Sequence, residues 1–461
     1  MHASPFTVSR RKFLAAGVIG GGLTLANLLR AEAAAGVGSS HKAVINVHLD
    51  GGPPQMDLID LKPQAPAEIR GEFTPIPTAI PGVQICEFLP KLAAAADKLV
   101  FIRSLVGAAS AHDAFQCMSG FDAKNLASIG GRPAMGSIVA KLRGTAADVS
   151  PSFVDLMQGR PLVRNSARPG FLGPTYQAFR PDMSQLFERP LEPGMVTELA
   201  NKGQNHTIAL SLSDGLSLDR VHDRTSLRQS LDRLKGEIDK SGMMHALDAF
   251  SQQAVGILTS GRFAAALDLS KEDPRVIQRY ALANASAEPA STTSDRPNAT
   301  LKFLLARRLV EAGARCVSIS ISDFDTHSNN FPRMRKVLPI VDHGLATLLA
   351  DLEERGMLGD VSIVAWGEFG RTPKVSGNGG RDHWPAVGMA LLAGGGIRAG
   401  QVIGETDRYA AAAISRPVHY QDVMATLYQN LGVNARATTI TDPSGRPQYL
   451  LDRGEALREL V

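Results

Sequence analysis

The fold is decided by SDFDTHSNNFP (Ser322–Pro332) and VSIVAWGEFGRTPKVSGNGGRDHWP (Val361–Pro385), two segments in the last third of the chain. They hold three groups of metal-ligand residue types, namely Asp325-Thr326-His327, Glu368 and Asp382-His383. Each group is placed after an apolar run, and continuous apolar runs are typical of buried parallel strands. We therefore expect an α/β fold with these side chains at the carboxyl ends of strands, where open α/β sheets bind ligands.

The three groups can converge on one ion, because the carboxyl ends of parallel strands meet at one edge of a sheet. Imidazole together with carboxylate suits Zn or Mn, whereas carboxylate alone suits Mg or Ca. Zn or Mn is thus the favoured divalent metal, with Ca or Mg as alternatives. Taken singly, His327 and His383 are also compatible with polar loop residues, and Glu368 with a structural carboxylate. The repeated arrangement favours the metal site.

A first strand is expected from Ala43 to Leu49, and Asp50-Gly51-Gly52 follows it. The glycines allow a sharp turn and a close approach of the backbone to a ligand. Asp50 is therefore a candidate metal ligand. The alternative is a turn-forming Asp-Gly pair.

A second buried strand is expected from Leu99 to Leu105, followed by a loop with Ser110 and His112 that runs into a helix. A hydroxyl beside a cation at a helix N-terminus can stabilise an anion or act as a nucleophile. Ser110 is the candidate nucleophile, and His112 is its acid–base partner or an anion contact. An N-cap serine with a histidine on the helix face explains the same residues equally well.

The order of helix, glycine and strand occurs twice, from Leu301 to Ile321 and from Val337 to Trp366. This order predicts right-handed βαβ units and a mostly parallel sheet. A mainly helical segment is expected at about residues 217–282, because apolar residues recur there every three to four positions. We assign residues 34–461 to one α/β domain that includes this segment.

Residues 1–33 are typical of an export signal. The twin-arginine motif Ser9-Arg10-Arg11-Lys12-Phe13-Leu14 precedes a mildly apolar segment and a small-residue cleavage site at Ala31-Glu32-Ala33. We expect the twin-arginine export machinery as a partner and a periplasmic or secreted location. No stable membrane span is expected after cleavage, since a spanning helix needs roughly 20 strongly apolar residues. An uncleaved anchor is the alternative.

Charge and cysteine content exclude several classes of protein. The chain has 49 basic and 45 acidic residues, and residues 1–33 hold four of the former and one of the latter. The remainder is near neutral and has no global field for nucleic acid or anionic membrane, so no nucleic-acid partner is expected. The three cysteines are odd in number and far apart, and therefore make no disulfide framework.

Seven segments together resemble a family of exported bacterial proteins, domain of unknown function 1501. They are LDGGPPQMDLIDLKP, GGRPAMGS, DFDTHSNNFP, GEFGRTP, GNGGRDHWP, LLAGGGIRAGQVIGETD and TDPSGRP. The resemblance implies an alkaline-phosphatase-like fold, shared with the sulfatases, in which a mostly parallel sheet is sandwiched between helices. It also implies a one- or two-metal centre for phosphate or sulfate esters.

The resemblance implies metal binding by Asp50, Asp325, His327, Glu368 and His383, with Asp382 as a further candidate. The sequence departs from the superfamily pattern at three places. One residue separates Asp325 from His327 where three are usual, Phe369 follows Glu368 where a histidine is usual, and no [CS]-x-[PA]-x-R run lies near residues 104–120. We therefore expect fewer protein ligands than in a full two-metal phosphatase.

Two functions from different classes fit these residues. The first is an exported metal-dependent hydrolase of a small anionic ester, or of a sulfated or phosphorylated glycan. In it Arg371 and Arg381 contact the anion, and water fits the missing nucleophile motif better than Ser110. The second is a non-catalytic relative with a binding or structural role in the cell envelope. The missing motif and Phe369 favour this second function.

Overall fold

The fold is described from a computed structural model that covers residues 42–126, 128–145, 148–158, 166–181, 183, 186–187, 261–282 and 295–461. The predicted export signal and most of the predicted helical segment at 217–282 lie outside these ranges. All the described residues belong to one compact unit, Lys42–Val461.

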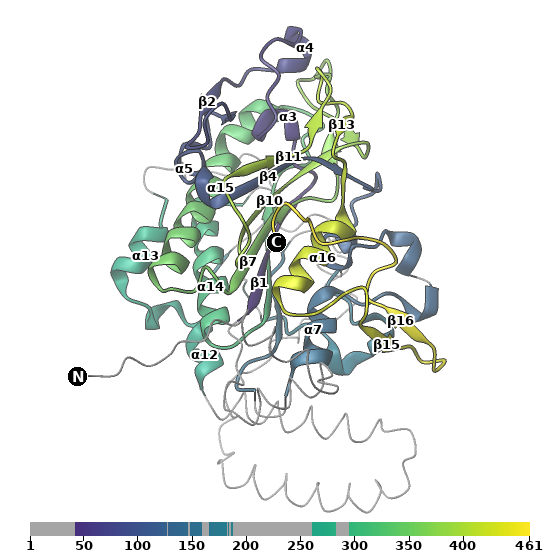
Figure 1. The fold of residues 1–461 in the computed structure, drawn as a ribbon. Helices are drawn as coiled ribbons and strands as arrows, with labels where there is room; N and C mark the ends of the chain where they lie inside the picture. The colour runs from purple at the N-terminus through teal and green to yellow at the C-terminus, as the bar shows by residue number, and fades with distance from the viewer. Residues whose placement is uncertain are drawn as a thin grey trace, which may run out of the picture. The chain divides into compact units, whose positions relative to one another are not determined.

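An eight-stranded sheet runs through this unit (Figure 1) in the order β11-β4-β10-β7-β1-β6-β5, with β14 paired to β4. The bounds are β1 Ala43–Asp50, β4 Leu99–Val106, β5 Phe153–Asp155, β6 Cys316–Ser322, β7 Val361–Trp366, β10 Gly388–Gly394, β11 Gln401–Ile403 and β14 Val418–His419. All neighbouring pairs are parallel except those that involve β10. The predicted α/β fold with a mostly parallel sheet is confirmed.

Strand β1 lies between β6 and β7, and its register brings three loops to one edge of the sheet. Asp50 pairs with Ser322, and His48 pairs with Trp366. The loops that follow β1, β6 and β7 therefore start side by side, as expected for parallel strands.

Strand β10 enters this edge from the opposite direction. Because β10 is antiparallel to β4 and β7, its first residue, Gly388, pairs with Leu105 near the end of β4. Asp382 and His383 thus reach the edge by preceding a strand. The expectation that this pair comes just after an apolar, buried strand is wrong, because only the two-residue strand β8, Gly370–Arg371, comes between β7 and the pair.

Helices cover both faces of the sheet and bury two separate apolar cores. One layer contains α5 Pro90–Ala94, α12 Arg262–Leu267, α13 Pro274–Tyr280, α14 Leu301–Glu311 and α15 Asn330–Glu354; the other contains α6 Phe115–Ser119, α7 Met135–Arg143 and α16 Tyr420–Asn430. Short elements complete the unit: α3 Gln55–Leu58, α4 Ala67–Arg70, β2 Pro75–Pro77, β3 Gln84–Cys86, β8 Gly370–Arg371, β9 His383–Trp384, β12 Glu405–Thr406, β13 Ala413–Ser415, β15 Thr439–Thr441 and β16 Pro447–Tyr449. In the part of the chain covered here, no helix combines the length and apolar character that a membrane span requires.

Helix α15 begins at Asn330, seven residues before the predicted start at Val337. Pro332 lies in its first turn, where the missing N–H has no partner in any helix. Pro339 lies inside the helix and is tolerated there. Pro332 therefore concealed the first two turns of this helix from the sequence pattern, whereas Pro339 lies within the predicted range.

Asp342 of α15 caps a neighbouring helix and provides a test of the packing. Its carboxylate accepts hydrogen bonds from the backbone N–H groups of Lys91 and Leu92, at 3.2 and 2.8 Å, in the first turn of α5. Burial raises the pKa of Asp342 to about 6 in spite of these donors. The folded protein therefore holds this proton more tightly than the unfolded chain does.

We expect ionisation of Asp342 to destabilise the fold as the pH rises from about 4 to above 6. Asp342→Asn removes this effect, so the unfolding free energy of the variant relative to wild type should rise over that window, by up to about 3 kcal/mol. Urea unfolding at pH 4 and pH 7 measures the difference. A relative stability that falls with pH contradicts the assignment.

Candidate metal centre

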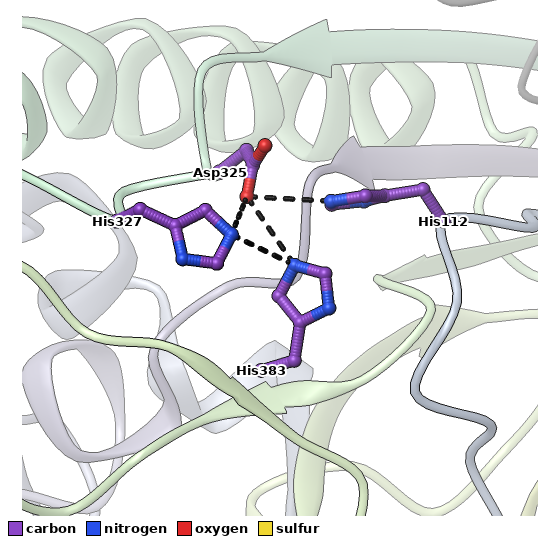
Figure 2. A group of neighbouring side chains, drawn as sticks. All are labelled: His112, Asp325, His327 and His383. Atoms are coloured by element: carbon purple, nitrogen blue, oxygen red, sulfur yellow. Dashed lines mark hydrogen bonds and ion pairs between the residues drawn. The ribbon is translucent and has the colours of Figure 1, made fainter.

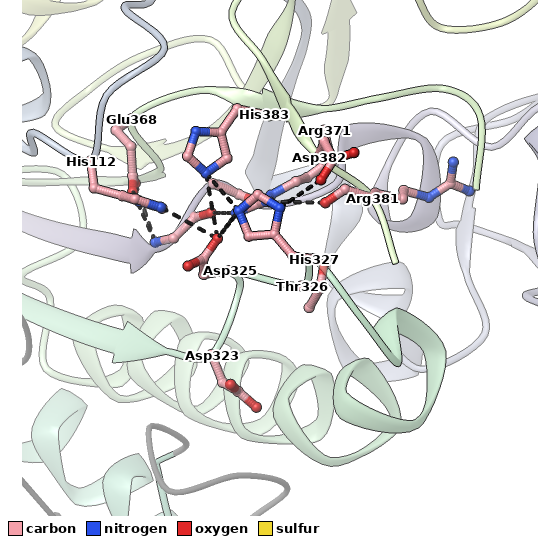
Figure 3. Close-up of polar contacts among 12 residues, drawn as sticks. His112, Asp323, Asp325, Thr326, His327, Glu368, Arg371, Arg381, Asp382 and His383 are labelled. Atoms are coloured by element: carbon pink, nitrogen blue, oxygen red, sulfur yellow. Dashed lines mark hydrogen bonds and ion pairs between the residues drawn. The ribbon is translucent and has the colours of Figure 1, made fainter. Parts of the chain in front are cut away.

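Four strands of the main sheet, or the loops that follow them, and the β8–β9 hairpin bring the candidate residues to the carboxyl edge of the sheet (Figure 3). His112 follows β4, Asp325 and His327 follow β6, Glu368 follows β7, and His383 lies in β9. Asp50 is the last residue of β1. The side chains form two adjacent groups, which we call the outer cluster (His112, Asp325, His327 and His383) and the inner cluster (His48, Asp50 and Glu368).

The outer cluster converges on one carboxylate oxygen (Figure 2). Oδ1 of Asp325 lies 3.3 Å from Nε2 of His112, 3.0 Å from Nε2 of His327 and 3.5 Å from Nε2 of His383. The Nε2 atoms of His327 and His383 are 3.0 Å apart. Four potential donor atoms therefore face a common point.

These spacings fit the edges of a tetrahedron. Ligands at 2.0–2.1 Å from a tetrahedral Zn²⁺ ion lie about 3.4 Å from one another. The four distances above run from 3.0 to 3.5 Å. Three imidazoles and one carboxylate are also a donor set that suits Zn²⁺ better than Ca²⁺ or Mg²⁺. The residues present thus fit the metal that the sequence pattern implies.

In each of the three histidines of the outer cluster, the second ring nitrogen, Nδ1, is hydrogen-bonded to an oxygen atom. Nδ1 of His112 lies 2.9 Å from Glu368 Oε1, and Nδ1 of His327 lies 2.6 Å from Asp382 Oδ1 (Figure 3). Nδ1 of His383 lies 2.8 Å from the carbonyl oxygen of Ser110. Carboxylate and carbonyl oxygens accept, so each Nδ1 carries a proton, and Nε2 is the nitrogen of each ring that a metal ion would use. This second shell is typical of metal-binding histidines.

The charges of the outer cluster support the same chemistry. Burial favours the neutral form of Asp325, but hydrogen bonds from His112, His383 and Arg371 outweigh it and hold the pKa of Asp325 well below its usual range. Burial disfavours the imidazolium of His112, but Asp325 and Glu368 outweigh it and raise the pKa of His112 to about 9. Asp325 is therefore ionised at neutral pH and can act as an anionic ligand.

The inner cluster includes one residue that the sequence analysis missed. His48 is fully buried, and among the described residues neither of its ring nitrogens has a hydrogen-bond partner. Its Nε2 lies 3.4 Å from Oε2 of Glu368. His48 and Asp50 are two positions apart in β1, so their side chains lie on the same face of the sheet. This spacing of two is visible in the sequence.

Glu368 joins the two clusters. Its Oε1 contacts His112 and accepts the backbone N–H of Gly51 at 3.1 Å, while its Oε2 faces His48. Burial raises the pKa of Glu368, but the neighbouring His112 and His48 lower it. The net shift of the pKa is downward. The carboxylate is thus ionised and serves both clusters.

Gly51 fixes the loop that carries Asp325. Its φ is +111°, and a Cβ added to it would lie 2.3 Å from the backbone nitrogen of Asp325. Arg371 closes the same junction, with donors directed at the carbonyl oxygens of Gly51, Gly52 and Arg381 and at Asp325 Oδ1, the last at 2.7 Å. The glycines after Asp50 were expected to let the backbone approach a ligand. The structure shows that Gly51 instead lets the backbone approach the loop that carries Asp325.

Six residues were predicted to bind metal, and the structure distributes them over three places. Asp325, His327 and His383 belong to the outer cluster, and Asp50 and Glu368 belong to the inner cluster. Asp382 lies outside both clusters and contacts His327, with 63% of its side chain exposed. Five of the six therefore lie in a cluster that also contains a histidine not predicted to bind metal, His112 or His48.

The four predicted catalytic residues also occupy different places. His112 is in the outer cluster. Ser110 is exposed and contacts His383 through its carbonyl oxygen. It does not begin a helix, because α6 starts at Phe115, whose N–H is accepted by Asp113. Arg371 and Arg381 are fully buried.

Arg381 uses every donor of its guanidinium within the protein. It makes a bidentate pair with Asp57 at 2.8 Å, and its remaining N–H groups reach the carbonyl oxygens of Ile69, Thr372 and Pro373. Such an arginine cannot also bind a substrate anion without breaking these contacts.

Replacing Asp382 by Asn tests the second shell. We expect Asp382→Asn to weaken metal binding about 10–100-fold, because the amide no longer fixes the ring orientation and basicity of His327. Competition with a chromophoric chelator measures the affinity. Asp360→Asn, an exposed change in the turn before β7, is the matched control and should bind as wild type does. Equal affinities in both variants would show that Asp382 does not support His327.

Fold and site together define an α/β protein with a candidate metal centre at the carboxyl edge of its sheet. The chain belongs to the family described as protein of unknown function (DUF1501), whose profile matches residues 41–461. The predicted family is thereby confirmed. Among curated proteins, no relative matches.

Several solved structures resemble the fold at low identity. A sulfatase from Pseudoalteromonas sp. is 12% identical with a TM-score of 0.40, over 89% of this chain and 70% of that one. A phosphonate monoester hydrolase from Silicibacter pomeroyi is 13% identical with a TM-score of 0.30, over 85% of this chain and 73% of that one.

Proposed function

We propose that the protein is an exported metal-dependent hydrolase of phosphate or sulfate monoesters. The observation that carries this proposal is the convergence of three Nε2 atoms and one carboxylate oxygen, with each imidazole oriented by an oxygen at Nδ1. Zn²⁺ fits this donor set best, and Mn²⁺ is the next candidate. The substrate class comprises small anionic esters and sulfated or phosphorylated glycans.

Asp325, His327 and His383 would hold the ion. Asp382 and the Ser110 carbonyl orient His327 and His383 through their Nδ1 atoms. A bound divalent ion supplies Lewis acidity, which polarises an ester oxygen and makes water a competent nucleophile near neutral pH. His112, with its raised pKa and its contact to the buried Glu368, is placed to give a proton to a leaving group.

Water is the nucleophile in this proposal. Ser110 contacts His383 through its backbone carbonyl oxygen and not through its side-chain hydroxyl. The absence of a sulfatase-type nucleophile run near residues 104–120 supports the same choice.

A second candidate is a non-catalytic, metal-holding relative with a binding or structural role in the cell envelope. The engaged donors of Arg371 and Arg381 favour it, because the two arginines expected to contact an anion are occupied by protein oxygens. Such a protein would bind metal in the same cluster without turnover.

Ester hydrolysis by the Zn²⁺-loaded protein separates the two candidates. With 4-nitrophenyl phosphate and 4-nitrophenyl sulfate as probes, a hydrolase should turn over at least one, and Asp325→Ala should lose metal and turnover together. Ser110→Ala should keep its turnover if water is the nucleophile. Full metal loading without turnover on these or on sulfated and phosphorylated oligosaccharides contradicts the hydrolase and supports the binding role.

Export by the twin-arginine pathway is the remaining part of the proposal, and it rests on Arg10 and Arg11. We expect Arg10→Lys with Arg11→Lys to retain the protein in the cytoplasm, whereas wild type reaches the periplasm or the medium. Cell fractionation measures this. Equal export of both proteins contradicts the assignment.

A further inference from the structure

We propose that His112 is a displaceable fourth ligand, carried on the loop from Gly107 to Asp113, and that its release opens the coordination position that an anionic substrate takes. This inference rests on the metal site of the proposed function. It adds a resting state in which the protein itself closes that site.

The outer cluster has one donor more than a catalytic zinc site uses. A structural zinc site has four protein ligands, whereas a catalytic site has three and keeps the fourth position open. Here Asp325, His327 and His383 provide three donors, and Nε2 of His112 occupies the fourth corner at 3.3 Å from Asp325 Oδ1. Hydrolysis at this centre therefore requires one of the four side chains to leave.

Three of the four donors are fixed by backbone packing on both sides. Asp325 lies against Gly51 and Arg371. His383 lies in β9, paired with Arg371 of β8. The His327 segment is held by the Arg381 N–H, which donates to the Thr326 carbonyl at 2.8 Å, and by Gly380, where an added Cβ would lie 1.9 Å from the His327 carbonyl oxygen.

The loop that carries His112 is held differently. Residues 107, 110 and 111 are exposed, and residues 108, 109 and 112 are half-buried. Within the described residues, its hydrogen bonds to distant segments run through the site, from the His112 ring to Glu368 and from His383 to the Ser110 carbonyl. The bonds of Ala109 to Gln116 and of Asp113 to Ala111 are local.

The ends of the loop are suited to a hinge. Gly107 has a φ of +93° and packs against the ring of His419, so that an added Cβ would lie 2.2 Å from its Nε2. At the other end the Asp113 carboxylate accepts the N–H of Phe115, the first residue of α6, and the chain leads into the buried residues Ala114 and Phe115. A backbone change near Gly107 can therefore move His112 while both ends stay in place.

The contact with Glu368 guides this movement. Because Nδ1 of His112 is anchored 2.9 Å from a fully buried carboxylate, the ring can turn its Nε2 away from Asp325 and keep the Nδ1 hydrogen bond. The released imidazole stays beside the vacated corner. It is then in place for the proton transfer described above.

Anion binding to the Co²⁺-loaded protein tests the proposal, with azide as the probe and visible absorption as the signal. If His112 occupies the fourth position about nine-tenths of the time, its removal in His112→Ala should tighten azide binding about tenfold. Free imidazole added to His112→Ala should restore the wild-type spectrum and compete with azide. Ala111→Ser, an exposed change in the same loop, is the control and should match wild type.

Equal azide affinities and equal Co²⁺ spectra in wild type and His112→Ala would overturn the inference. Retained metal uptake in that experiment would leave the proposed function intact. Failure of the wild type to bind Co²⁺ or Zn²⁺ would overturn both. Thermal unfolding of the metal-free proteins checks that His112→Ala is folded, which its place on an exposed loop leads us to expect.

Discussion

Asp325→Asn should lower the affinity for Zn²⁺ by more than about a hundredfold and remove ester turnover with it. Asp325 Oδ1 is the atom on which His112, His327 and His383 converge, so the amide removes both a donor and the charge of the cluster. Loss of a residue that only orients a ligand already costs about 10–100-fold, and loss of the ligand itself should cost more. Competition with a chromophoric chelator measures the affinity.

Asp323→Asn is the matched control for this variant. Asp323 lies two residues before Asp325 in the same loop, but its side chain points away from the cluster and pairs with Arg333 (Figure 3). The control should keep its metal affinity. A common loss in both variants would indicate a disturbed loop, and a wild-type affinity in Asp325→Asn would remove Asp325 from the centre.

Arg381→Ala should destabilise the fold by about 3–5 kcal/mol, because it leaves a fully buried partner without its counter-charge. The pair with Asp57 has no exposed side-chain surface on either side. Burial already raises the pKa of Asp57 with Arg381 present, so loss of the arginine should drive the carboxyl further toward its neutral form. Urea unfolding of the metal-free protein measures the change.

Arg335→Ala provides the comparison for an exposed pair. Arg335 bonds Glu72 at 2.6 Å, and both side chains are about half exposed, so its loss should cost at most about 1 kcal/mol. Arg381→Ala could instead lower the unfolding free energy as little as Arg335→Ala and weaken only substrate binding. Arg381 would then be an anion contact, as predicted from the sequence, and its pair with Asp57 would contribute little to stability.

The strands that build the site could be predicted from the sequence. Ala43–Leu49, Cys316–Ile321 and Val361–Trp366 are continuous apolar runs, and each is a buried strand with a candidate ligand at or just past its carboxyl end. Because parallel strands end at one edge, the proximity of Asp50, Asp325 and Glu368 followed from this pattern alone.

The roles of individual side chains could not be predicted in the same way. Which ring nitrogen of His327 faces Asp325 and which faces Asp382 depends on the β8–β9 hairpin and its position against the sheet. The direction of β10 is set by its pairing with β4 and β7, which no local pattern records. Arg381 looked like an anion contact because its partner, Asp57, lies 324 positions away in the sequence.

Metal content is the most direct test of the candidate centre. Elemental analysis of the folded wild type, purified without chelator, should find Zn or Mn at near stoichiometric amount, and the His327→Ala, His383→Ala double variant should lose it. Those two substitutions remove two of the four converging donors, and both lie outside the eight strands of the main sheet. A wild type that holds no divalent metal and takes none up on addition would contradict the account.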